Sequence, residues 1–181
     1  DRSLGQLQGG LMRAAHLVDQ MLLLARLDPE SGLPSPAPVD LTPLAEAVCA
    51  ELGEQILAKR LDFELQAAPG CVVGGQAEWL RVLIRNLVDN AIRYTPVGGR
   101  VVVGLSHDER ACRLQVTDSG PGIPPEQRAA VLRRFHRLHQ GDQPGCGLGL
   151  AIVARIVELH GARLELGEAG PGLAVTVSWP A

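Results

Sequence analysis

The stretch Arg85-Asn-Leu-Val-Asp-Asn-Ala-Ile-Arg-Tyr-Thr-Pro96 decides how the rest of the chain is interpreted. Apolar residues before and within it recur at helical spacing, which predicts one strong helix over residues 76–94. Asn86 and Asn90 stand four residues apart and share a helical face, although asparagine is a poor helix former. Amide oxygens at this spacing can hold a hard cation that also contacts phosphates. The alternative is two asparagines that only face solvent.

The end of the same helix carries two further candidates. Asp89 and Arg93 form a second polar pair four residues apart. Tyr94, the only tyrosine of the chain, follows directly and could stack on a flat ring.

A second motif, Thr117-Asp-Ser-Gly-Pro-Gly-Ile123, directly follows a predicted strand. Asp118 leaves that strand and enters a turn, and Gly120 and Gly122 would let the backbone approach a ligand closely. A carboxylate held there can accept a hydrogen bond from an amino group such as that of adenine, which contributes about 1.5–3 kcal/mol. The alternative is a plain Asp-Ser-Gly turn, and such turns are common.

A third motif, Gly145-Cys-Gly-Leu-Gly-Leu-Ala-Ile-Val153, places three glycines at every second position before a helix. Backbone N–H groups and the positive helix end together form an anion site. No Gly-Lys-Ser/Thr follows, so the segment is not a P-loop, and no strand leads into it as in a dinucleotide fingerprint. The alternative is a flexible loop ended by a helix. Jointly, the three motifs indicate ATP with magnesium.

The remaining pattern predicts an α+β two-layer sandwich, with one sheet and helices packed on one face. We expect helices over 41–57, 76–94, 125–135 and 147–160 and strands over 61–65, 71–73, 100–105, 112–117, 163–166 and 173–179. Asp40 or Thr42 would cap the first of these helices.

The amino-terminal part differs from this pattern. Residues 1–28 carry an a/d heptad pattern, which predicts one long helix that packs on a partner helix, the alternative being an ordinary helix on its own domain. Residues 29–38 are rich in proline and predict a linker, so the globular domain would span residues 39–181.

Composition excludes several classes of protein. The 181 residues suffice for one buried domain with a small appendage, and a net charge of −3 does not suit a nucleic-acid-binding surface. The four cysteines lack metal-site spacing, so we expect free thiols in a reducing cytosol. No run of 18 apolar residues is present, and a membrane link would need segments upstream of the chain.

Four segments in order resemble the motifs of bacterial sensor histidine kinases. Residues 86–95 resemble the N box, residues 118–123 the first glycine box, residues 132–137 the F box and residues 145–152 the second glycine box. The residues of the N box are similar to those of the QseC-like group. The resemblance implies the Bergerat ATP-binding fold, a mixed sheet with helices on one face.

The resemblance also implies individual roles. Asn90 would ligate magnesium, Asn86 would help to hold the metal and the phosphates, and both would act in catalysis together with Arg93, which would lie near the phosphates. Asp118 would bind the adenine amino group. The other implied nucleotide-site residues are Tyr94, Gly120, Gly122 and Ile123 around the base, Phe135 and Arg137 at the lid, and Gly145, Gly147, Leu148, Gly149 and Leu150 at the phosphates.

Residues 1–28 resemble the second helix of the dimerisation and phosphotransfer hairpin, whose first helix would carry the phosphoaccepting histidine. No acceptor motif occurs in the sequence, and His16 lacks its acidic neighbour, so we expect that this chain cannot phosphorylate itself.

The implied function is transfer of the ATP γ-phosphoryl group to that histidine, for relay to an aspartate of a response regulator. The expected partners are a receiver domain, the protein's own hairpin and a second copy, in the cytoplasmic part of an inner-membrane sensor. One alternative is another Bergerat-fold ATPase, which would carry a glutamate base where Asn86 stands. The other is an ATP-binding scaffold for dimerisation.

Overall fold

The computed structural model describes residues 18, 22, 36–133 and 147–180. Their centre is a five-stranded sheet with the order β2-β4-β5-β7-β6. The sheet is mixed, because β2 pairs parallel to β4 while the other neighbouring strands pair antiparallel. The strands are β2 (Asp62–Ala67), β4 (Arg100–His107), β5 (Ala111–Asp118), β6 (Arg163–Glu168) and β7 (Leu173–Pro180).

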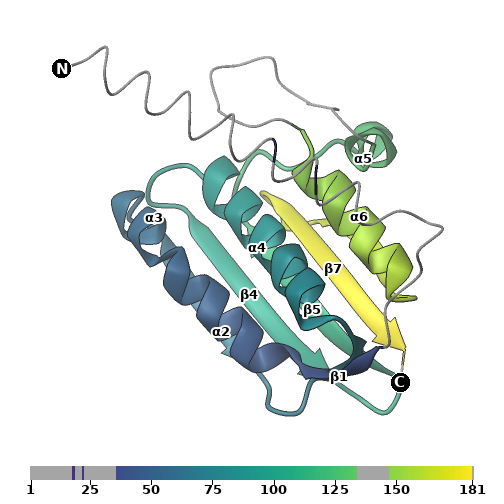
Figure 1. Ribbon diagram of the computed structural model, residues 1–181. Coiled ribbons are helices and arrows are strands. Elements are labelled where there is room, and N and C mark those ends of the chain that lie inside the picture. The colour runs from purple at the N-terminus through teal and green to yellow at the C-terminus, as the bar shows by residue number, and fades with distance from the viewer. Residues whose placement is uncertain (1–17, 19–21, 23–35, 134–146, 181) are drawn as a thin grey trace.

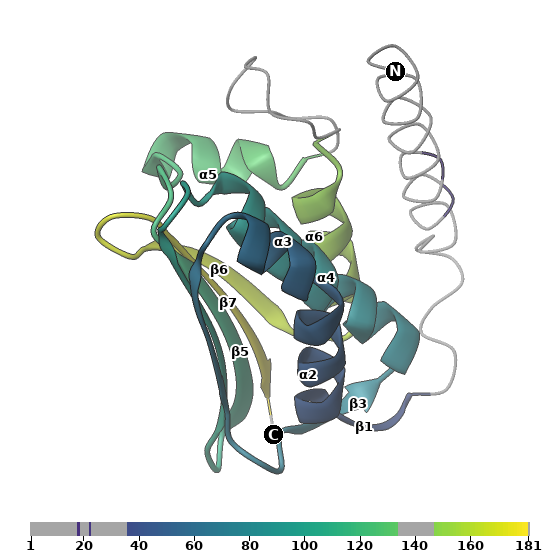
Figure 2. The ribbon, with the colours of Figure 1, turned by 90° about the vertical axis from the view of Figure 1, so that its left-hand side faces the viewer.

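Three helices of the described ranges cover one face of this sheet. They are α2 (Leu41–Glu51), α4 (Ala77–Tyr94) and α6 (Gly149–Leu159), with α4 between the other two (Figures 1 and 2). Two shorter helices, α3 (Gly53–Ala58) and α5 (Pro125–Val131), follow α2 and β5 along the chain. The expected α+β two-layer sandwich is therefore confirmed.

The two layers meet through residues whose spacing matches their element. Alternate residues of β4 are buried, and the apolar positions of α4 that recur at helical spacing are buried as well. The core consists almost wholly of aliphatic side chains, so many small side chains rather than a few large aromatic ones fill it. The core residues of β4 are Val101, Val103 and Leu105, and those of α4 include Leu80, Leu83, Ile84, Leu87 and Val88.

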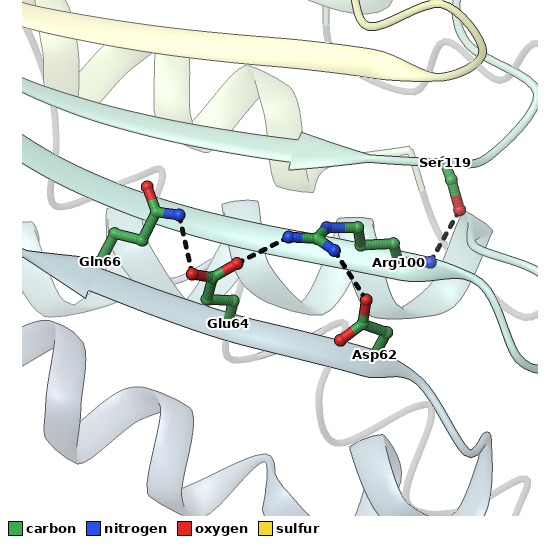
Figure 3. A network of polar contacts seen from close by, with 5 residues as sticks. All are labelled: Asp62, Glu64, Gln66, Arg100 and Ser119. Atoms are coloured by element: carbon green, nitrogen blue, oxygen red, sulfur yellow. Dashed lines mark hydrogen bonds and ion pairs between the residues drawn. The ribbon is translucent and has the colours of Figure 1, made fainter.

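The opposite face of the sheet is polar and carries a network around Arg100 (Figure 3). The Arg100 guanidinium contacts Asp62 at 2.9 Å and Glu64 at 2.7 Å, across the parallel β2–β4 pair. Its main chain exchanges two hydrogen bonds with Ser119, at 2.8 Å to the hydroxyl and 3.0 Å from the Ser119 N–H. Exposed ion pairs contribute little stability. The two main-chain hydrogen bonds join the start of β4 to Ser119, the residue that follows β5.

One expected helix is two helices in the structure. The helix expected over 41–57 is broken at Leu52, whose backbone (φ −89°, ψ 1°) leaves the helical range before Gly53 starts α3. Asp40 is the cap of α2, because its side chain accepts a hydrogen bond of 2.9 Å from the Thr42 N–H.

A short ladder also changes the expected linker boundary. Strand β1 (Ala37–Asp40) pairs antiparallel with β3 (Val72–Gly75), so residues 37 and 38 belong to a strand rather than to the linker.

The helix expected over 125–135 ends at Val131 within the described residues. The rest of the linker and nearly all of the predicted first helix lie outside the described residues; Val18 and Leu22 are helical and about half exposed.

The expectation of free thiols is wrong for two cysteines, because Cys71 and Cys112 form a disulfide. They lie 41 positions apart in the sequence, and the fold brings the residue before β3 to the start of β5, where their Cα atoms are 5.5 Å apart. The closed loop contains all of α4 and β4, so the bond restricts the unfolded chain over the centre of the domain. Cys49 is a buried thiol, and burial raises its pKa to about 11.

The carboxyl end of α4 is held by Lys59, the only lysine of the chain. Its ammonium donates to the carbonyl oxygens of Ile92 at 2.9 Å, Arg93 at 2.7 Å and Thr95 at 2.9 Å. These are carbonyls that the end of a helix leaves without partners, and the positive charge also suits the negative helix end. Burial, with the nearby Arg93 charge, lowers the pKa of the Lys59 amine.

The amino end of α4 is held by His160, which ends α6 as expected. His160 Nδ1 bonds the Ile156 carbonyl at 2.7 Å, and Nε2 accepts a hydrogen bond of 3.2 Å from the Gln76 N–H. These partners require the neutral ring with its proton on Nδ1. Gly75 lies against the ring so closely that a Cβ there would overlap it.

Replacing Lys59 by methionine keeps the aliphatic stem and removes the three hydrogen bonds. We expect the free energy of unfolding to fall by about 2 kcal/mol, because three carbonyls at the helix end lose a charged donor. Urea denaturation measures this change. Arg110→Met, at an exposed turn residue, is the matched control and should shift stability by less than about 0.5 kcal/mol. Equal stability of the two variants would contradict the capping role.

Burial lowers the pKa of His160 below its ordinary value of 6.5. The unfolded chain therefore binds a proton more readily than the folded one. The stability owed to the neutral ring should be complete above about pH 6.5 and lost as the pH falls through the folded pKa. Urea denaturation of the wild type and of His160→Gln from about pH 7.5 to 5 tests this, with His107→Gln as control. The stability gap between wild type and His160→Gln should shrink on acidification, and a gap independent of pH would refute the prediction.

Candidate functional site

The first and third sequence motifs meet where α6 begins beside α4. A Cβ on Gly149, the first residue of α6, would lie 3.1 Å from Asn86 Oδ1 and 3.3 Å from Asn90 Nδ2. Both asparagine side chains therefore face the amino-terminal turn of α6, where N–H groups lack helical partners. The spacing of four residues on one helix and the glycine on the other make this contact possible.

Asn86 is oriented by its own helix. Its Nδ2 donates a hydrogen bond of 2.9 Å to the Val82 carbonyl one turn earlier, which turns Oδ1 toward Gly149. This arrangement explains why asparagine stands inside the helix, where it is otherwise unfavourable.

Arg93 lies on the same helical face one turn after Asn90, where the sequence placed it. Its guanidinium pairs with Asp89 at 2.5 Å, and both side chains are about three-quarters buried. The expected pairing of Asp89 with Arg93, four residues apart, is therefore confirmed. The ion pair holds the Arg93 side chain against its own helix.

Asp118 ends β5 and is one of two buried polar residues in the described ranges, with 7% of its surface exposed. Its Oδ1 accepts a hydrogen bond of 2.8 Å from the Gly120 N–H, and the Leu173 N–H bonds the same carboxyl group. Burial raises the pKa of this carboxyl group, while the two N–H donors act against that shift. A desolvated carboxyl group with fixed orientation suits recognition of an amino group.

The loop that follows Asp118 (residues 119–124, the Asp118 loop) rests on the carboxyl end of α4. A Cβ on Gly120 would lie 2.9 Å from the Tyr94 carbonyl oxygen and 2.8 Å from Asp118 Oδ1, so only glycine fits there. Tyr94 itself is 46% exposed. Asp118 is thus brought to the end of the helix that carries Asn90 one turn earlier.

The same loop also packs on the β6–β7 hairpin. Gly122 has φ +70°, and a Cβ there would lie 2.9 Å from the Gly172 carbonyl oxygen. Gly172 has φ +119°, and a Cβ there would overlap the Asp118 carbonyl oxygen. Neither glycine can be replaced without moving the Asp118 loop.

Of the other residues that the sequence predicted at the phosphates and the lid, three lie in the described part of the chain and three do not. Gly147 has φ +72°, Leu148 is fully buried, and Leu150 is half-buried beside Gly149. Phe135, Arg137 and Gly145 lie outside the described residues. The sequence motifs missed Lys59 and Arg128, because each acts through main-chain carbonyls that no motif marks.

The site thus consists of two contacts joined by α4. One contact joins Asn86 and Asn90 to Gly149, and the other joins Tyr94 to Gly120 and Asp118. Amide oxygens beside a helix amino terminus suit a phosphate group with a hard cation. The buried Asp118 carboxyl group suits an amino donor at the other end.

Comparisons with known proteins agree with this geometry. The profile of the "Histidine kinase-, DNA gyrase B-, and HSP90-like ATPase" family matches residues 75–181. The chain is 41% identical over 182 residues to the sensor protein kinase PmrB of Pseudomonas aeruginosa, and the match covers 99% of this chain and 38% of PmrB.

Two solved structures are similar in fold and sequence. The cytoplasmic segment of histidine kinase QseC has a TM-score of 0.63 and 32% identity, and the match covers 92% of each chain. Full-length ShkA in complex with AMPPNP has a TM-score of 0.77 and 30% identity, over 90% of this chain and 35% of ShkA.

The chain spans about two fifths of the curated relatives that it matches, 38% for PmrB and 39% for QseC of Escherichia coli K12. None of the helices in the described ranges is long and apolar enough to cross a membrane. The family profile covers more than half of the chain and includes α4, the Asp118 loop and α6. The chain therefore belongs to the histidine kinase-, DNA gyrase B- and HSP90-like ATPase family, and within it to the ATP-binding domains of sensor histidine kinases.

Proposed function

We propose that this domain binds ATP with magnesium between α4, α6 and the Asp118 loop, and presents the γ-phosphoryl group to a histidine. The contact of Gly149 with Asn86 and Asn90 carries the proposal, because it places two amide side chains at a helix amino terminus. The ShkA structure, which holds AMPPNP, an analogue of ATP, supports it.

The protein's contribution is position and charge. Asn90 would hold magnesium, with Asn86 as a second ligand, and the N–H groups at the start of α6 would bind the phosphates. When bound, magnesium would neutralise negative charge on the phosphate oxygens. Asp118 would accept a hydrogen bond from the adenine amino group, and Tyr94 would border the base. No residue of the chain needs to form a covalent bond to phosphorus.

The proposed acceptor is a histidine on the protein's own phosphotransfer hairpin, and the final acceptor is an aspartate of a receiver domain. In the intact protein we propose a homodimer whose catalytic domain is cytoplasmic. The sensor-kinase names of the relatives support these partners, while residues 1–28, with their heptad pattern, would supply one hairpin helix.

A water-directed ATPase of the same family is the second candidate. It would need a general base beside the phosphates. Such ATPases carry a glutamate where this chain has Asn86, and an amide cannot take up a proton at neutral pH. The side chain is also committed to Val82 by a 2.9 Å hydrogen bond. Phosphoryl transfer to a histidine therefore agrees better with this site than hydrolysis does.

Replacement of Asn90 by alanine should weaken binding of a magnesium-ATP analogue by about tenfold or more, because a metal ligand is lost. Calorimetric titration measures the affinity with magnesium and with excess chelator. Gln115→Ala is the control, because Gln115 lies exposed on the polar face of the sheet and bonds Thr176. With chelator, wild type and Asn90→Ala should bind alike. An unchanged affinity of Asn90→Ala in magnesium would contradict the proposed metal role.

Incubation of the chain with γ-labelled ATP should give no acid-labile, alkali-stable phosphate on the protein, because no acceptor-histidine motif is present. His16→Ala serves as the matched variant. Label that appears on the wild type and disappears in His16→Ala would show that His16 is an acceptor after all.

A further inference from the structure

We infer that Arg128 is a positioning residue for the nucleotide base, because it fastens the Asp118 loop to the β6–β7 hairpin. The inference rests on the ATP site proposed above and deepens it, since it names what sets the selectivity for adenine. Nothing in the motifs marks this arginine, which lies on α5 outside the residues assigned to the nucleotide.

Arg128 makes three hydrogen bonds with its guanidinium group. Nε donates to the Ile123 carbonyl at 3.1 Å, and Nη1 donates to the Leu166 carbonyl at 3.2 Å. Nη2 pairs with Glu168 at 3.1 Å. One side chain thus joins the end of the Asp118 loop to β6.

The main-chain contacts matter more than the ion pair. The Arg128 side chain is 22% exposed, whereas Glu168 is 73% exposed, so water screens the charge pair. The two carbonyls, in contrast, accept hydrogen bonds from a largely buried planar guanidinium group, whose donors have a fixed geometry. A lysine carries all its donors on one nitrogen, so it cannot reproduce a fork of three separate nitrogen atoms.

The hairpin that Arg128 holds is the support of Asp118. The Leu173 N–H bonds the Asp118 carboxyl group, and Gly172 lies against the Asp118 carbonyl. Gly122 of the loop packs in turn on the Gly172 carbonyl. Any shift between loop and hairpin therefore changes the direction of the Asp118 carboxyl group.

Arg128 and the phosphate half of the site belong to different parts of the fold. The three hydrogen-bond partners of Arg128 lie on the loop and on β6, whereas Asn86, Asn90 and Gly149 meet between α4 and α6. Loss of Arg128 should therefore reduce recognition of the base and leave binding of the phosphates nearly unchanged. General destabilisation would weaken both.

Inosine triphosphate separates these effects, because it carries a carbonyl oxygen where ATP carries the amino group. The experiment measures dissociation constants of ATP and inosine triphosphate with magnesium for the whole chain, by titration at a temperature well below each melting midpoint. The variants are Arg128→Met, Arg128→Lys and the control Arg163→Met, which removes an exposed arginine from the same strand β6.

We expect the wild type to prefer ATP by about tenfold or more. Inosine triphosphate has no amino group, so the buried Asp118 carboxyl group would lose a hydrogen-bond donor when it binds. Arg128→Met should lower this preference at least about threefold, chiefly through weaker ATP binding, and Arg128→Lys should lower it by less. Arg163→Met should keep the wild-type preference.

An unchanged preference in Arg128→Met, or an equal loss for ATP and inosine triphosphate, would overturn the positioning role. Loss of cooperative melting in both Arg128 variants would overturn it as well, because the residue would then be needed for folding. A wild type that binds ATP without preferring it over inosine triphosphate would also refute the inference. A wild type that binds no ATP would instead refute the proposed function.

Discussion

The packing of α6 against α4 at Gly149 is the contact on which the candidate site depends. A side chain at this residue would meet the amides of Asn86 and Asn90, so glycine lets the start of one helix approach the polar edge of the other. The apolar side of α4 is meanwhile buried against the sheet. One helix therefore serves both the core and the site, and its rotation about its axis cannot change without loss of burial.

Both ends of α4 are fixed by side chains from other elements. Lys59 bonds three carbonyls at its carboxyl end, and His160 bonds the Gln76 N–H at its amino end. The Cys71–Cys112 bond encloses the same helix in one covalent loop. Because these restraints come from three different parts of the chain, apolar packing is not alone in holding α4 in position.

The Asp118 loop is supported from another side. It rests on the end of α4 through Gly120 and on the β6–β7 hairpin through Gly122 and Gly172. Because the two halves of the site have separate supports, base recognition and phosphate binding can be tested independently. This separation is what makes the effect expected for Arg128 selective.

Residue spacing predicted most of the helices and strands, the two layers and the asparagine face of α4, because hydrophobic period and motif spacing are local properties. It did not predict β1, whose residues 37 and 38 were assigned to the linker. The break at Leu52, the pairing of Cys71 with Cys112, and the contacts of Lys59 and Arg128 became visible only in the folded chain. The disulfide joins cysteines that are distant in the sequence, and the helical pattern of residues 41–57 does not mark the turn at Leu52. Lys59 and Arg128 bind main-chain carbonyls, which every residue carries, so no side-chain pattern in the sequence could mark their partners.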